Sequence, residues 1–243
     1  MDKLLKNFIS NNTFLLIAVI IYLLIKVVII YFIPNVDLTV DDSSTYISFA
    51  QSLKHYSLIE TFFNEKNLNL FFRTPIFPFL VYLLDGSIKA ISFTQSLIWV
   101  ILCLLLFSRE SKNKDYLYYF LIIYFLYHPN IFYHTSVILP ETIFVMCVSL
   151  GILFLNLSDF NNEKSFRYVI IFYFFICVST LIKPVSYYLV YIFFLFFLFV
   201  MRNHKNFKLF IFCCLIIFIS TTGLWCFRNY YLVGCFALFL FFS

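Results

Sequence analysis

One polar stretch, between about residues 35 and 74, interrupts an otherwise apolar chain. Its first part contains acidic residues, and its end contains a cation followed by two prolines: Asp37, Asp41, Asp42, then Arg73, Pro75 and Pro78. Carboxylates can accept a proton from an attacking group, and a guanidinium can bind an anion through paired hydrogen bonds. We therefore expect the chemistry of this protein to lie in this stretch.

The remainder of the chain has the composition of a membrane protein. Of its 243 residues 63% are hydrophobic and 12% are charged, and the mean hydropathy is +0.95. These values lie far outside the usage of soluble domains. Because a helix needs roughly 20 apolar residues to cross the hydrocarbon, the sequence predicts an all-α, polytopic transmembrane helical bundle of about seven spans. The predicted spans cover residues 13–34, 90–108, 116–130, 139–158, 168–182, 185–201 and 208–227.

The distribution of basic residues predicts the orientation of this bundle. Most of the 17 basic residues fall in segments on the same side as the N-terminus, including residues 109–114 and 202–208. Cytoplasmic loops are enriched in Lys and Arg, so we expect a cytoplasmic N-terminus and an outward-facing loop at residues 35–89. All six prolines lie in or near the predicted outer segments, which indicates irregular backbone and a structured pocket on that side.

Helical periodicity organises the outer loop. Residues 43–56 place Tyr46, Phe49, Ala50 and Leu53 on one face, which predicts an interfacial amphipathic helix. Asp42 stands at its start and could simply cap it. A second interfacial stretch is expected at residues 58–72, and residues 76–84 are too short to span, so we expect them to pack the loop back against the bundle.

The cysteines and a few further polar residues are the remaining candidates for disulfide, metal or binding sites. The seven cysteines lack ligand spacing, and His128, His134 and Glu141 are too unevenly spaced to specify a metal, so we expect no disulfide framework, metal or cofactor. Lys26 lies inside the first span, where a charge costs about 2.5–3.5 kcal/mol, so it should have a function or a partner, such as the outer carboxylates.

The order of short motifs resembles that of a known enzyme family. The motifs are Asp-x-x-x-Tyr-x-x-x-Ala-x-x-Leu from Asp42, Arg-Thr-Pro-x-x-Pro from Arg73, Pro140-Glu141-Thr142, Lys183-Pro184, and Arg228-Asn229-Tyr230 with Gly234. Together they resemble the membrane-embedded type-C glycosyltransferases, relatives of the dolichyl-phosphate-mannose protein mannosyltransferases and the bacterial aminoarabinose transferases. The resemblance implies one membrane-embedded module over residues 1–243: tail and first span (1–34), outer catalytic loop (35–89) and remaining bundle (90–243).

The resemblance also implies a reaction. A sugar would pass, with inversion, from a polyprenyl-phosphate donor to an acceptor lipid, glycan or protein on the outer face of the bacterial inner membrane. A phosphate leaving group needs no proton, so such a site needs one base and several cations. Asp42 would be the base, with Asp41 as the other candidate. The binding residues implied for the lipid phosphate and substrate are Arg73, Lys183, Arg228, Tyr46 and Glu141.

Several alternatives stay open. Family members continue with further membrane helices, whereas this chain ends in an apolar run at residues 241–243, which predicts a truncated and inactive relative that binds partners only. A transporter, flippase or glycan polymerase is the other class. Among single residues, Arg73 could bind lipid headgroups, Arg228 could anchor its span, and Glu141 could stabilise a helix N-terminus. No nucleic-acid partner is expected.

Overall fold

The computed structural model describes residues 12–33, 38–39, 42–55, 60, 74–107, 116–156 and 165–233. Every regular element within these residues is a helix, as the sequence predicts. The chain divides into two compact units, Met1–Ser44 with Ser87–Thr142 (unit 1) and Thr45–Gly86 with Ile143–Ser243 (unit 2). The second predicted interfacial stretch, residues 58–72, lies outside the described residues except for Glu60.

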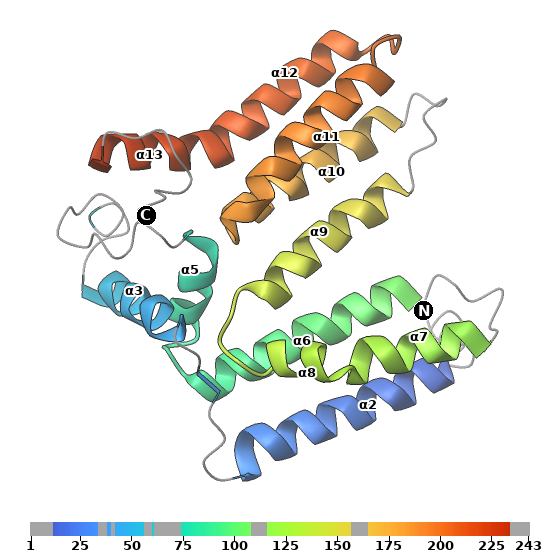
Figure 1. Ribbon diagram of the computed structural model, residues 1–243, viewed down its shortest axis with the longest axis vertical. Helices are drawn as coiled ribbons and strands as arrows, with labels where there is room; N and C mark the ends of the chain where they lie inside the picture. Colours follow the sequence, from blue (N-terminus) through green and yellow to red (C-terminus); the bar gives the residue numbers. More distant parts are fainter. Residues whose placement is uncertain are drawn as a thin grey trace, which may run out of the picture. The chain divides into compact units, whose positions relative to one another are not determined.

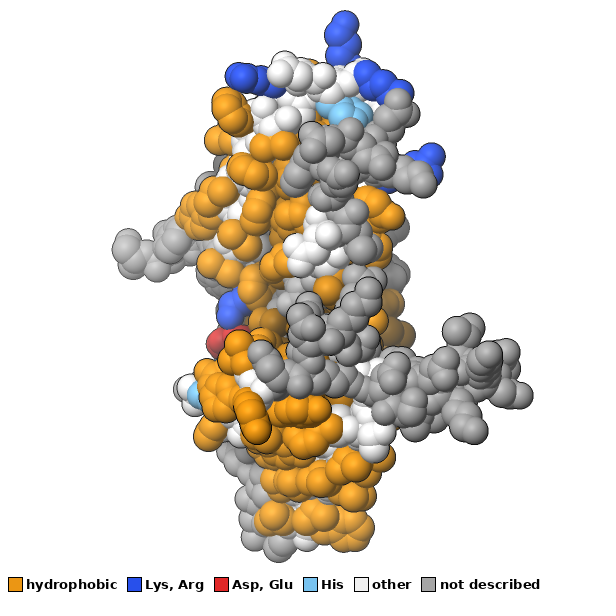
Figure 2. Space-filling view, turned by 90° about the vertical axis from the view of Figure 1, so that its right-hand side faces the viewer, with side chains coloured by type: hydrophobic (Ala, Val, Ile, Leu, Met, Phe, Trp, Pro, Cys, Tyr) orange, Lys and Arg blue, Asp and Glu red, His pale blue; other side chains and the backbone are white. Residues whose placement is uncertain are grey.

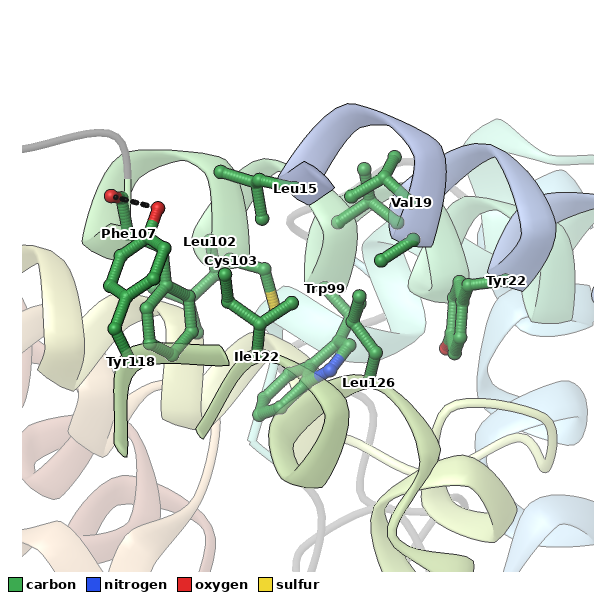
Figure 3. Close-up of a cluster of buried hydrophobic side chains, with 12 residues drawn as sticks. Leu15, Val19, Tyr22, Trp99, Leu102, Cys103, Phe107, Tyr118, Ile122 and Leu126 are labelled. Atoms are coloured by element: carbon green, nitrogen blue, oxygen red, sulfur yellow. Dashed lines mark hydrogen bonds between the residues drawn. The ribbon is translucent and has the colours of Figure 1, made fainter. Parts of the chain in front are cut away.

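Unit 1 is built around three apolar helices that pack side by side (Figure 1). Its elements are α2 (Thr13–Val27), the π-helix η1 (Val28–Phe32), α6 (Ile88–Phe107), α7 (Tyr116–Tyr127) and the short α8 (Pro129–His134). Figure 3 shows their core, in which Leu15 and Val19 of α2 face Leu102 of α6 and Ile122 of α7. Burial of these apolar side chains holds the three helices together.

Unit 2 contains the remaining helices. Two of them, α3 (Ser43–His55) and α9 (Glu141–Leu155), belong to unit 2 from their third residue onward. The others are α5 (Ile76–Leu83), α10 (Ser165–Thr180), the 3₁₀ turn η3 (Pro184–Ser186), α11 (Tyr187–Val200), α12 (Phe207–Phe218), the π-helix η4 (Ile219–Gly223) and α13 (Leu224–Val233). Helices α10, α11 and α12 pack against one another (Figure 1). Their shared core is aromatic, and in it Phe172, Phe197 and Phe210 are fully buried.

Helix α9 approaches α10 closely because it carries a glycine at the contact. A Cβ atom at Gly151 would lie 3.2 Å from Cβ of Phe175 and 3.3 Å from Cδ2 of Phe172. The ring of Phe154 also stacks on that of Phe175, with 5.9 Å between centroids. The absence of a side chain at Gly151 therefore sets the distance between these two helices.

Three helical segments are long and apolar enough to cross a membrane: Thr13–Phe32, Ile88–Phe107 and Phe207–Tyr231. Four shorter apolar helices coincide with the other predicted spans. Figure 2 shows hydrophobic side chains over much of the visible surface, with Lys and Arg side chains gathered where the α11–α12 turn lies. These features suggest a membrane protein, while the count of seven spans and the orientation stay predictions.

The amphipathic helix predicted at residues 43–56 is confirmed as α3. All four side chains of its predicted apolar face, Tyr46, Phe49, Ala50 and Leu53, are buried. Phe49 and Leu53 pack with Tyr82 of α5. The predicted short segment at residues 76–84 is α5, so the apolar segment near the end of the predicted outer loop forms a helix that packs against α3.

Candidate functional site

In unit 1, Asp42 lies where the chain is tied to the segment before α9. Asp42 is exposed and directly precedes Ser43, which is fully buried. The Ser43 hydroxyl donates a hydrogen bond to the carbonyl of Ile138 at 3.0 Å, and the Ile138 amide donates to the carbonyl of Leu38 at 3.0 Å. These bonds hold the chain next to Asp42 against residues just before the Pro140-Glu141 motif.

The segment between α8 and α9 is irregular, and side chains of α6 satisfy its carbonyl groups. Ser92, Gln95 and Ser96 each donate to a carbonyl within residues 135–139, at 2.5 Å for Gln95 and 3.2 Å for Ser96. Irregular backbone inside a membrane requires such donors, because no water is available to it. The sequence predicted irregular backbone from its prolines; Pro140 ends this segment, and Pro129 is the first residue of α8 before it.

Lys26 of α2 is fully buried against the same segment. Its Nζ donates to the carbonyl of Phe132 at 2.6 Å, to Oγ1 of Thr135 at 2.8 Å and to Oγ of Ser136 at 2.5 Å. Nζ also lies 3.7 Å from the centroid of the Phe132 ring. The expected partner therefore exists as a set of neutral oxygens; of the outer carboxylates, Asp37 and Asp41 lie outside the described residues.

Glu141 is the first residue of α9 and is half-buried. A carboxylate at this position is favourable because the first turn of a helix carries partial positive charge. Thr142 beside it donates to the carbonyl of His134 at 3.3 Å, which ties the start of α9 to the end of α8. The geometry fits the helix-stabilising interpretation, and substrate binding by Glu141 stays a prediction.

In unit 2, two motifs far apart in the sequence meet. The Thr74 hydroxyl donates to the carbonyl of Ile182 at 2.7 Å, across 108 residues, and the Ile76 amide donates to the carbonyl of Leu181 at 3.1 Å. Thr74 directly follows Arg73, which lies outside the described residues, and Ile182 directly precedes Lys183. The chain positions next to two of the predicted phosphate-binding cations are therefore hydrogen-bonded to each other.

Arg228 of α13 belongs to the same region of unit 2. Only 4% of Arg228 is exposed, and its Cζ lies 4.6 Å from the centroid of the Trp225 ring. Its guanidinium donates to Oδ1 of Asn229 at 3.0 Å. Trp225 in turn packs with Leu181 and Tyr187, on either side of the Lys183-Pro184 motif. Three of the motifs that carry the resemblance thus converge around the turn between α10 and α11.

Two threonines, which the sequence did not indicate, add a further contact near the α10–α11 turn. The hydroxyls of Thr180, at the end of α10, and Thr222, in η4, lie 2.9 Å apart and both residues are fully buried. A π-helical turn within a span often marks a functional site. In unit 1, Ser92, Gln95 and Ser96 were also missed. The available signal was the presence of polar side chains at the ends of apolar runs.

Tyr46 has a structural role in unit 2. It is 5% exposed, and its ring meets that of Phe77 edge-on with 4.9 Å between centroids. The contact packs α3 on α5, close in sequence to the Arg-Thr-Pro motif. Contact of Tyr46 with substrate stays a prediction.

The predicted site residues are divided between the units. Unit 1 contains Asp42 and Glu141, and unit 2 contains Tyr46, Lys183 and Arg228, while Asp41 and Arg73 lie outside the described residues. Among the residues that the structure describes, no group of three or more His, Cys, Asp or Glu could hold a metal ion. Unit 2 therefore contains the cations Lys183 and Arg228, and unit 1 contains an exposed carboxylate, Asp42, beside a hydrogen-bonded segment.

Comparisons of the chain with protein-family models, with curated proteins and with solved structures found no match.

Proposed function

We propose that this protein is a membrane glycosyltransferase that moves a sugar from a polyprenyl-phosphate donor to an acceptor lipid, glycan or protein on the outer face of the membrane. The observation that supports it most is the hydrogen-bonded junction between Thr74–Ile76 and Leu181–Ile182 in unit 2. This junction adjoins two motifs for which the resemblance implies phosphate binding. Such proximity is what a shared phosphate site requires, because a single phosphate must contact all of its cations.

The chemistry of the residues supports the same reaction. As the bond to the sugar breaks, negative charge develops on the lipid phosphate, and fixed cations such as Lys183 and Arg228 would stabilise it. Arg228 is held by the Trp225 ring and Asn229, so little reorganisation is needed when charge develops. The base would be Asp42, which is exposed and can reach an acceptor hydroxyl or amine. In this proposal the chain crosses the membrane in seven spans with Asp42 outside.

The test is transfer of radiolabelled sugar from a panel of polyprenyl-phosphate sugars, in membranes that contain the full chain. Asp42→Asn should lower transfer about 10²–10⁴-fold, the usual contribution of a general base. Asp85→Asn is the matched control, since Asp85 is also exposed and its positive φ of 56° is tolerated by Asn. Full activity of Asp42→Asn would exclude Asp42 as the essential base, and the same test on Asp41→Asn would then follow.

A wild-type chain that inserts well but transfers no sugar from any donor would contradict the proposal. That outcome would favour the truncated relative that only binds partners. A transporter or flippase is a further candidate, favoured by the irregular segment at residues 135–139, because transporters bind their cargo at breaks in membrane helices. Movement of labelled lipid-linked sugar across proteoliposomes, without covalent transfer, would support this candidate.

A further inference from the structure

Unit 1 contains a cavity of about 500 Å³ that the proposed reaction does not use. Its lining is mostly apolar and includes Ile25 of α2, Ile29 of η1, Pro129, Phe132 and Tyr133 of α8, and Ser136. The volume lies within the range of roughly 300–1,000 Å³ that is typical of small-molecule sites. This cavity is therefore large enough to hold a ligand.

The cavity opens among side chains that would face lipid. Ile25 and Tyr133 in the lining are 38% and 51% exposed, and the neighbouring Val28 of η1 is 50% exposed. These residues belong to, or lie beside, the last two turns of the apolar segment Thr13–Phe32. A bilayer around this segment would bring hydrocarbon chains directly to the opening, near the end of the span.

A positive charge stands directly behind the lining. Ser136, which is 7% exposed, accepts a hydrogen bond from Lys26 Nζ at 2.5 Å. Lys26 has three hydrogen-bond acceptors, which matches the three protons of an ammonium group, and all three acceptors are neutral oxygens. Among the described residues, no carboxylate forms an ion pair with Lys26. Within the described part of the chain, its charge is therefore solvated by neutral oxygens and is not neutralised by a carboxylate.

We propose that the cavity binds an anionic phospholipid of the surrounding bilayer. One acyl chain occupies the apolar lining, and the anionic headgroup lies on the side of Ser136, where the field of Lys26 attracts it. A buried ammonium acts over a longer range than a surface lysine because the surrounding medium screens it little. The apolar lining selects a lipid chain, and the unneutralised charge selects an anionic headgroup over a zwitterionic one. The inference does not depend on the glycosyltransferase proposal.

The test uses the full chain in detergent, with phosphatidylglycerol and phosphatidylcholine of identical acyl chains. Retained lipid is counted by native mass spectrometry, and lipid-dependent thermal stabilisation is measured in parallel. Wild type should bind phosphatidylglycerol at least tenfold more tightly than phosphatidylcholine. Lys26→Met should remove this preference, because it keeps the length of the side chain and deletes the charge.

A second variant tests the inference independently of whether Lys26→Met folds. Ile29→Trp fills the cavity and keeps the charge, so it should lower retention of both lipids, whereas Leu24→Trp on the exposed side of the same helix should not. Equal binding of the two lipids by wild type, a preference for phosphatidylglycerol that persists in Lys26→Met, or unchanged lipid retention in Ile29→Trp would overturn the inference. Displacement of phosphatidylglycerol by an equal amount of a polyprenyl phosphate would also overturn it, by assigning the cavity to a different lipid.

Discussion

The irregular segment of unit 1 (residues 135–139) and the α10–α11 turn of unit 2 obtain hydrogen bonds for their backbone carbonyl groups in different ways. Both interrupt apolar helices beside a proline. In unit 1 the carbonyls of residues 135–139 receive hydrogen bonds from buried side chains, including those of α6. In unit 2 the turn is tied by Thr74 and Thr180, and its cation Lys183 is only half-buried. Lys26, which donates hydrogen bonds to the irregular segment, is enclosed, whereas Lys183, which we propose to bind phosphate, remains accessible.

Burial alone does not distinguish Lys26 from Arg228, but their partners do. Both are almost fully buried, but Lys26 has all three protons bound by neutral oxygens. Arg228 rests on an aromatic face and donates to a side-chain amide. In the two proposals, Arg228 contacts an anionic phosphate directly, whereas Lys26 acts on an anionic headgroup only through its field. This difference gives four predictions, from the largest expected effect to the smallest.

Arg228→Gln should lower sugar transfer by about 10²–10³-fold, the usual cost of removing one group that stabilises developing negative charge. The assay is the rate of transfer per inserted molecule. Arg202→Gln is the matched control, because Arg202 lies in the exposed α11–α12 turn. Equal rates in wild type and Arg228→Gln would remove Arg228 from the phosphate site and leave it as an anchor of its helix.

Lys26→Met should instead lower the free energy of unfolding, by about 1–3 kcal/mol, because it removes one donor from each of three buried oxygens. The measurement is equilibrium unfolding in mixed micelles. Lys89→Met is the control in the same unit, since Lys89 is exposed. Unchanged stability would show that Thr135 and Ser136 satisfy this segment without Lys26, and would weaken the contrast between the two regions.

Thr74→Val should lower the free energy of unfolding by about 0.5–1.5 kcal/mol, the net value of one hydrogen bond. Because Thr74 ties α5 to the α10–α11 turn, the sugar-transfer rate should fall as well. Thr94→Val, at a half-buried threonine of α6, provides the comparison. Loss of stability with a full transfer rate would separate this junction from the proposed phosphate site.

The smallest effect concerns the Lys54–Asp85 ion pair on the surface of unit 2. The hydrogen bond from Lys54, and then its charge, hold the pKa of the Asp85 carboxyl below its ordinary value. A lowered pKa stabilises the folded state above the ordinary value of about 3.9, and the contribution is lost as the pH falls through the folded pKa. Unfolding of wild type and Asp85→Asn should therefore differ slightly at pH 7 and converge at acidic pH. A difference that persists in acid would assign it to the backbone at Asp85.

Much of the fold could be predicted from the sequence. Apolar runs gave the positions of the long helices, because burial or lipid contact of such runs requires a helix. The period of Tyr46, Phe49, Ala50 and Leu53 predicted α3 to within one residue at its end. For the site, the motifs indicated which chain segments carry candidate residues, but the hydrogen-bond partners that the structure describes for Lys26 are neutral oxygens, which the sequence did not indicate.

The sequence by itself determined the class of this protein and its helices, because hydropathy and periodicity are local properties of the chain. Only the tertiary structure decided which segments meet: Ser43 with Ile138, Thr74 with Ile182, and Thr180 with Thr222. These contacts join residues 42–108 positions apart, and nothing local in the chain specifies them. They form because each polar group removed from water must find a partner, and the packing of apolar helices determines which partners are within reach.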